Sequence, residues 1–164
     1  MNQELEHSFV TQLEENQNIV HKICRLYTND SDSHNDLFQE ITIQLWRAFP
    51  KFRGDSKFST WMYRVALNTA ITLYRKSKRK IKTQDYESVS FKIKSEDYDD
   101  TVEQQLLLMY SAVKELNDID KALVFLYLED KSYREISAAL GISEVNARVK
   151  MNRTKEKLRT ILNP

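Results

Sequence analysis

Apolar residues recur at intervals of three and four along most of the chain, which predicts amphipathic helices. The first covers 5–28, and polar residues at 16–18 predict an interruption in it. A second helix follows over 36–49 and is expected to stop at Pro50, since proline breaks a helix interior. A third is expected from about 58 to 79.

The second half of the chain carries sharper helix signals. After a helix over 105–117, Asp118 is expected to cap the next one. Ser132 and Glu135 have the spacing of a capping box that opens a short helix. Gly141 then provides a turn, and Ser143 caps a last helix with apolar spacing. A short helix, a glycine turn and a capped second helix are typical of a helix-turn-helix, although an ordinary helical hairpin has the same spacing.

Between these halves, residues 81–104 lack sustained periodicity, and 83–104 contain 7 acidic and 2 basic side chains. This composition predicts a flexible acidic linker. The predicted fold is therefore all-α, with one small helical domain at 5–80 and a second at 105–162.

Composition narrows the function classes. The 164 residues include only 2 glycines and 2 prolines, which argues against turn-rich β folds and against glycine-dependent nucleotide-binding loops. The single cysteine, Cys24, forms no disulfide within the chain and fits a reducing cytoplasm. His7, His21 and His34 lack metal-ligand spacing, and no membrane span or signal peptide is evident. We therefore expect a cytoplasmic protein without metal, cofactor, membrane insertion or catalytic activity.

Charge is strongly segregated, although the net charge is only +1. Residues 1–46 carry 8 acidic and 2 basic side chains, whereas 47–82 carry 11 basic and 1 acidic. The tail, 144–164, is again basic, with 6 basic and 2 acidic side chains. Two basic patches predict two surfaces for a polyanion.

The outer face of the last predicted helix suits duplex DNA. Arginine bonds guanine through two donors, asparagine bonds adenine, and lysine neutralises phosphate. The candidate DNA-binding residues on this helix are Asn146, Arg148, Lys150, Asn152 and Arg153.

Two blocks of the sequence resemble a known family. Residues 36–76, DLFQEITIQLWRAFPKFRGDSKFSTWMYRVALNTAITLYRK, resemble region 2 of bacterial sigma factors, in particular the extracytoplasmic-function (ECF) type. Residues 114–159, which include KSYREISAALGISEVNARVKMNRTKEKLR, resemble region 4 of the same family. The resemblance implies a transcription initiation factor that binds core RNA polymerase and recognises the −35 and −10 promoter elements.

The resemblance also implies where polymerase binds. Region 2 would dock on the β′ clamp coiled coil, and region 4 would contact the β flap. The region 2 residues implied are Asp36, Gln39, Glu40, Ile43 and Trp46, although Ile43 and Trp46 are equally suited to a core. An anti-sigma factor is a further partner that the resemblance admits and the sequence does not identify.

Promoter opening is expected from the segment around 52–68. A loop at 52–60 would enclose a flipped base, and aromatic and polar side chains would hold the single strand and its backbone. The candidate residues are Arg53, Gly54, Asp55, Ser56, Lys57, Trp61, Arg64, Asn68, Arg75 and Lys76.

Two other functions are weighed against this one. A stand-alone helix-turn-helix regulator would need dimer symmetry and would leave the 36–49 helix without a role. A nucleic-acid-processing enzyme would use Asp97, Asp99 and Asp100 with a metal, but these lie in the predicted linker.

Overall fold

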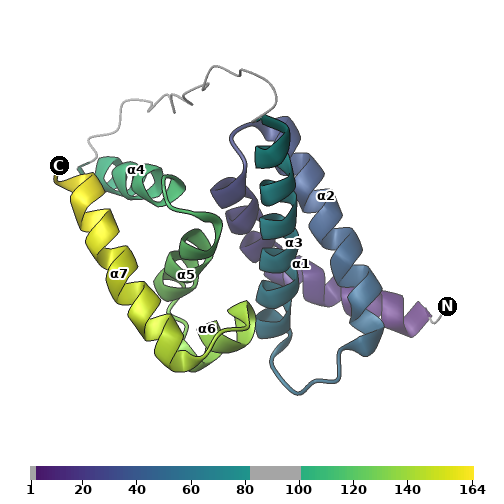
Figure 1. The fold of residues 1–164 in the computed structure, drawn as a ribbon. Coiled ribbons are helices and arrows are strands. Elements are labelled where there is room, and N and C mark those ends of the chain that lie inside the picture. The colour runs from purple at the N-terminus through teal and green to yellow at the C-terminus, as the bar shows by residue number, and fades with distance from the viewer. Residues whose placement is uncertain (1–2, 82–100) are drawn as a thin grey trace.

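The computed structural model describes residues 3–81 and 101–164, and every regular element within these two ranges is a helix (Figure 1). The all-α prediction is confirmed. Most of the predicted linker, 81–104, lies outside the described residues, as do Asp97, Asp99 and Asp100. Its two ends are helical in the structure, because the third helix runs to Ile81 and the fourth begins at Thr101.

The first half contains α1 (Gln3–Tyr27), α2 (Ser31–Ala48), the 3-10 turn η1 (Phe49–Lys51) and α3 (Phe58–Ile81). The predicted interruption of the first helix is wrong. At that point Asn16 donates a 2.8 Å hydrogen bond to the Gln12 carbonyl, and the polar segment stays helical. Helix α2 begins earlier than predicted because the Asp30 carboxylate caps it, accepting from the Ser33 amide at 2.7 Å.

The second half contains α4 (Thr101–Lys114), α5 (Asp118–Leu128), α6 (Tyr133–Leu140) and α7 (Glu144–Leu162). Asn117, not Asp118, caps α5, and its side chain accepts from the Asp120 amide at 2.8 Å. That correction leaves the Asp118 carboxylate available for another partner.

The helix-turn-helix signals are confirmed. Ser132 and Ser143 accept from backbone amides at 3.1 and 3.0 Å and open α6 and α7. Gly141 has the left-handed φ of 69° that the turn requires. Across the turn, the Ser137 hydroxyl donates to the Ile142 carbonyl and ties the two helices together.

The buried apolar residues of both halves form one connected core. Ile23, Ile41 and Met62 come from α1, α2 and α3 and are fully buried among those helices. Leu123 and Ile136, from α5 and α6, are buried in the second half. Most helices therefore present one apolar stripe inward, as their sequence spacing predicted, whereas α5 is buried over the consecutive residues 120–126.

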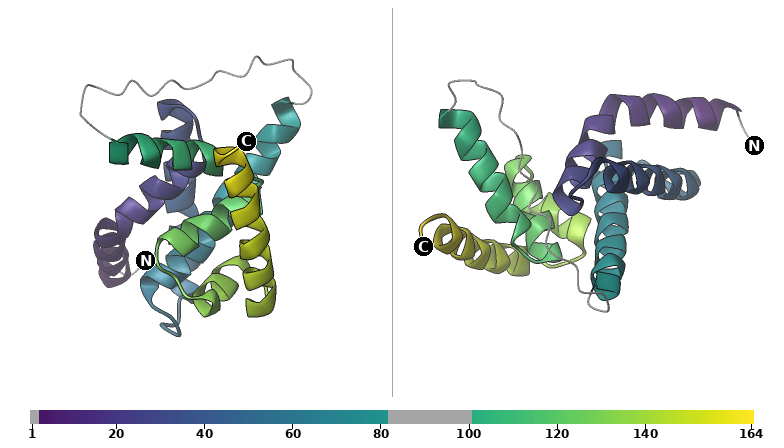
Figure 2. Two further views of the ribbon diagram at one scale, coloured as in Figure 1. Left: turned by 90° about the vertical axis from the view of Figure 1, so that its left-hand side faces the viewer. Right: turned by 90° about the horizontal axis from the view of Figure 1, so that it is seen from above.

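The halves also pack on each other. Helix α3 lies against α5 and α6, and α1 touches α4 (Figures 1 and 2). Where they meet, the ring centroids of Tyr63 and Phe125 are 6.0 Å apart. Among the described residues, no helix is both long and apolar enough to span a bilayer.

Candidate nucleic-acid interface

The loop before α3 is exposed and rests on an aromatic cluster. Its five candidate residues, 53–57, are all exposed, and Gly54 has a φ of 76°. Beneath the loop, the ring of Trp61 lies 5.2 Å from that of Phe52 and 5.4 Å from that of Phe58. The loop therefore has polar groups facing solvent and is supported from below by packed aromatic rings.

Trp61 is one of the aromatic residues that support the loop. It is half-buried and also lies 6.2 Å from the ring of Phe49. Burial fixes the indole, and its remaining exposed part is available for stacking on a base. The two readings of Trp61 made from the sequence, burial and base contact, are thus compatible.

Helix α3 brings the remaining candidates of this half onto one side. Trp61, Arg64, Asn68 and Arg75 follow helical spacing, and the last three are exposed, with Lys76 next to them. The opposite side is buried through residues such as Met62 and Leu67. This side of α3 therefore carries an aromatic ring, a guanidinium group, an amide and a second guanidinium group, in that order.

Arg75 already has a partner in the structure. Its guanidinium donates to the carboxylate of Asp118 at the start of α5. Burial raises the pKa of Asp118, but the bond from Arg75, a bond from the Ile119 amide and nearby cations outweigh it, so the pKa lies below its usual value. Arg75 is therefore paired with a carboxylate of the second half.

Helix α7 has a buried side and a wide exposed side. Ala147, Met151, Thr154 and Leu158 face inward. Of the predicted DNA-binding residues, Asn146, Arg148, Asn152 and Arg153 are exposed and Lys150 is half-buried. They fall on two flanks of the exposed side, with Asn146, Lys150 and Arg153 on one flank and Arg148 and Asn152 on the other.

Between these flanks lie two residues that the sequence reasoning missed. Val145 and Val149 keep 69% and 41% of their surface exposed. Apolar side chains in a recognition helix contact the methyl group of thymine. The signal was their spacing, since both fall opposite the buried positions and have no place in the core.

Arg148 is positioned by its neighbour in the helix-turn-helix. Its guanidinium carbon lies 5.4 Å from the centre of the Tyr133 ring in α6. Such stacking orders a long side chain before it binds, which lowers the entropy lost on binding.

A second candidate surface runs along α2. Asp36, Gln39, Glu40, Ile43 and Trp46 share one side of the helix, opposite the buried Leu37, Ile41 and Leu45. Ile43 is 43% exposed. The side therefore combines two carboxylates with exposed apolar surface, as protein-binding surfaces do.

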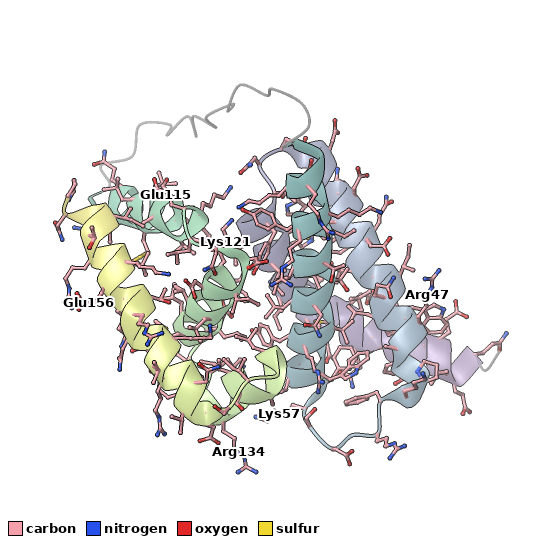
Figure 3. All side chains as sticks on the ribbon, in the orientation of Figure 1. Arg47, Lys57, Glu115, Lys121, Arg134 and Glu156 are labelled. Atoms are coloured by element: carbon pink, nitrogen blue, oxygen red, sulfur yellow. The ribbon has the colours of Figure 1, made fainter. Side chains whose placement is uncertain are left out.

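Two features modify the α2 surface. The Trp46 ring packs 5.1 Å from that of Phe9 in α1, so this residue supports the fold as well. Arg47, which the sequence did not indicate, is exposed on the same side (Figure 3).

The described residues contain no group of three or more His, Cys, Asp and Glu side chains placed to hold a metal. The histidines include one close pair, because His21 Nδ1 lies 3.1 Å from His34 Nε2. The His21 ring also stacks on Phe38 at 4.5 Å, which places the pair in the packing of α1 against α2.

The fold and these surfaces define a class: an all-helical DNA-binding protein with a helix-turn-helix in one half and an acidic, apolar surface in the other. Comparison with known proteins agrees. Residues 13–80 match sigma-70 region 2, and residues 106–158 match sigma-70 region 4. The chain belongs to the sigma-70 family, and the relatives that match most of its length include ECF sigma factors.

Three similar proteins illustrate the match. The ECF RNA polymerase sigma-E factor of Haemophilus influenzae is 27% identical over 163 residues, covering 90% of this chain and 84% of that protein. The RNA polymerase sigma-H factor of Pseudomonas aeruginosa is 47% identical over 53 residues, which are 30% of this chain and 28% of that protein. The sigma factor RpoE of Bartonella quintana, solved with the anti-sigma factor NepR, has the same fold, with a TM-score of 0.74 at 19% identity over 94% of this chain and 96% of that one.

Family membership decides between the alternatives. The chain is a transcription initiation factor that depends on RNA polymerase, and the stand-alone regulator is not favoured. The match to region 2 includes α2 and the segment 58–68 at the start of α3, which a stand-alone regulator would leave without a role.

Proposed function

We propose that this chain recruits core RNA polymerase to promoters, reading the −10 element with the 53–57 loop and α3 and the −35 element with α7. The domain at 5–80 would provide polymerase docking and strand opening, and the domain at 105–162 would read duplex DNA. The observation that carries this proposal is the placement of an exposed loop and the polar side of α3 in one half and a helix-turn-helix in the other.

Strand opening would follow from selective binding of an unpaired base. Extruding a base from the stack costs a few kcal/mol, so a site that binds only the flipped base favours melted DNA. Gly54 lets the loop curve, and the exposed side chains of this loop would bind the DNA. Asp55 and Ser56 would offer hydrogen-bonding groups to a base edge, and Arg53 and Lys57 would contact the flanking phosphates.

Polymerase docking would use the α2 surface. Two carboxylates beside an exposed isoleucine suit a basic partner surface such as that of the β′ clamp coiled coil, and the second half would contact the β flap. The chain would act in the cytoplasm, direct the chemistry of polymerase and catalyse no reaction itself. An anti-sigma factor that covers these surfaces is a further proposed partner, supported by the Bartonella relative, which was solved with one.

Permanganate footprinting tests the opening step, because it detects unpaired thymines. Holoenzyme made with Asn68→Ala, or with residues 53–57 exchanged, should lose thymine reactivity at the −10 element and still bind core polymerase. Ser77→Ala, an exposed change on α3 away from this polar side, is the matched control. Normal melting and unchanged −10 preference in both loop and Asn68 variants would refute the reading of this surface.

A further inference from the structure

Two exposed valines lie in the middle of the outer side of α7. One side of this helix packs on α4, α5 and α6, and the opposite side faces away from the other helices (Figure 1). Val145 and Val149 lie on that outer side, with 69% and 41% of their surface exposed. A single exposed valine is ordinary on a protein surface, but these two are one turn apart and share one side of the helix. Together they form a small apolar strip.

The strip lies where a helix-turn-helix contacts base edges. Ser143 caps α7, so Val145 and Val149 fall in its first two turns. In this motif the second helix enters the major groove, and residues near its N-terminus contact bases. The groove is about 12 Å wide and a helix with its side chains is about 10–12 Å across, so the middle of the outer side meets the groove floor. The valines would therefore face bases rather than phosphates.

Polar side chains that suit DNA flank the strip on both sides, with Asn146, Lys150 and Arg153 on one flank and Arg148 and Asn152 on the other. The three cations can neutralise phosphates on both walls of the groove. The same cations argue against an apolar protein surface as the partner, because a cation covered without an anionic group loses its hydration uncompensated. An apolar strip between cations therefore fits a groove with anionic walls.

Thymine is the base whose groove edge best matches a valine. It presents its C5 methyl group in the major groove, whereas the other bases present mainly hydrogen-bonding groups there. A valine side chain cannot replace the water bonded to such a group, and leaving a polar group without a partner costs free energy. Contact between the isopropyl and methyl groups instead removes apolar surface from water. Each valine should therefore prefer a thymine.

The spacing of the valines limits the spacing of the thymines. Val145 and Val149 are four residues apart, which is about 6 Å along a helix that rises about 1.5 Å per residue. Successive bases of one DNA strand are about 3.4 Å apart, so two steps are about 6.8 Å. The two valines can thus contact thymines of neighbouring base pairs, or of base pairs two steps apart, at the same time.

We propose that Val145 and Val149 select thymine at two base pairs of the −35 element, which lie at most two steps apart. The proposal rests on the proposed function, because it identifies bases within the element that α7 would read. It goes further by assigning part of the promoter sequence to two side chains that form no hydrogen bonds. The thymines can belong to either strand, since both strands present their methyl groups in the same groove.

Removal of single methyl groups from the DNA tests the proposal without changing the protein. Holoenzyme, which is core polymerase with this chain, first selects a promoter from a randomised library. Each thymine of its −35 block is then replaced in turn by deoxyuridine, which lacks only the C5 methyl group. At two positions, at most two steps apart, holoenzyme should bind about fourfold more weakly, as expected for one methyl-sized group left unburied. Deoxyuridine in the spacer between the elements should leave binding unchanged.

Alanine variants connect each position to a side chain. With Val145→Ala or Val149→Ala, the loss caused by deoxyuridine should disappear at one of the two positions and persist at the other. Both valines are exposed and alanine favours a helix, so the variants should melt no lower than wild type. Val10→Ala on α1, where 42% of the valine is exposed, is the matched control and should keep both losses.

The outcomes separate this proposal from the proposed function. A −35 block without thymine, or one in which deoxyuridine binds as well as thymine at every position, would overturn the thymine assignment alone. Losses that remain in both alanine variants would overturn it too. Weaker binding of these variants to core polymerase without DNA would show that the strip contacts protein instead. A selection that enriches no block near −35 would refute the proposed function itself.

Discussion

The residues expected to contact DNA differ from core residues because their side chains make few contacts that stabilise the fold. Asn68, Arg64 and Arg153 are exposed, so their truncation should leave stability close to wild type. Arg148 is the exception on the recognition helix, because it stacks on Tyr133. Truncation of Arg148 should therefore weaken DNA binding and also remove its packing contact with Tyr133.

Arg148→Ala should cost on the order of 1–3 kcal/mol of binding to the preferred −35 sequence, if the guanidinium reads a base. Discrimination at one base pair should fall with it. Titration of wild type and variant against matched and mismatched duplexes measures both quantities, with Arg159→Ala, an exposed change at the end of α7, as the control. A uniform loss over all duplexes, with a salt slope smaller by about one, would assign Arg148 to phosphate instead.

His34 should make stability depend on pH. Burial, then the charges of His21 and Arg25, lower its pKa below the ordinary 6.5, so the folded state resists its protonation. The unfolded chain binds more protons as the pH falls below 6.5, and stability must fall with it, whereas above 6.5 the contribution is fully present.

Thermal melts between pH 5.5 and 7.5 check this directly. The midpoint for wild type should drop toward pH 5.5, and His34→Gln should flatten that dependence. His7→Gln, on the exposed side of α1, should not. Parallel pH profiles for wild type and His34→Gln would show that the proton is taken up elsewhere.

At the scale of elements, local sequence signals predicted which helices form better than they predicted where each helix begins or whether it is interrupted. The capping serines and the spacing of apolar residues predicted α6 and α7 correctly, because a cap acts on backbone amides only a few residues away. The polar residues at 16–18 wrongly predicted an interruption of the first helix. In the structure, the Asn16 side chain bonds to the preceding turn and α1 is continuous. The cap of α5 was misplaced by one residue because Asn117 and Asp118 are both good caps.

Gly141→Ala should destabilise the second half by about 1 kcal/mol, because an L-residue is strained at φ 69°. Space is not the cause, since an added Cβ at this position meets nothing within 4 Å. Denaturant unfolding measures the loss, and Gly141→Asn should recover part of it, because asparagine tolerates this conformation. No difference between alanine and asparagine would rule out the backbone explanation.

The α2 surface gives a prediction that separates binding from folding. Ile43→Ser should weaken binding to core polymerase at least tenfold with an unchanged melting temperature, because its side chain is exposed. Val10→Ser, equally exposed on α1, is the matched control. Trp46→Ala should instead lower stability, since the ring packs on Phe9. Undiminished polymerase affinity for Ile43→Ser would remove α2 from the docking surface.

For the whole molecule, the order of helices and the two candidate surfaces could be predicted from sequence, but the contact between the halves could not. Helical spacing shows which side of α3 is buried, without showing that Tyr63 and Tyr74 reach residues of α5. A buried lysine such as Lys121 also contradicts expectation from residue type. Its partners lie 47 and more residues away, and such long-range contacts leave no local pattern.

Transcription from a library of randomised promoters tests the central claim most directly. Core RNA polymerase is incubated with the library, with and without this chain, and transcripts are sequenced together with the DNA upstream of each start. We expect this chain to enrich promoters that share two short blocks near −35 and −10 at a fixed spacing. Enrichment that is absent, or identical to that of core enzyme alone, would contradict its function as an initiation factor.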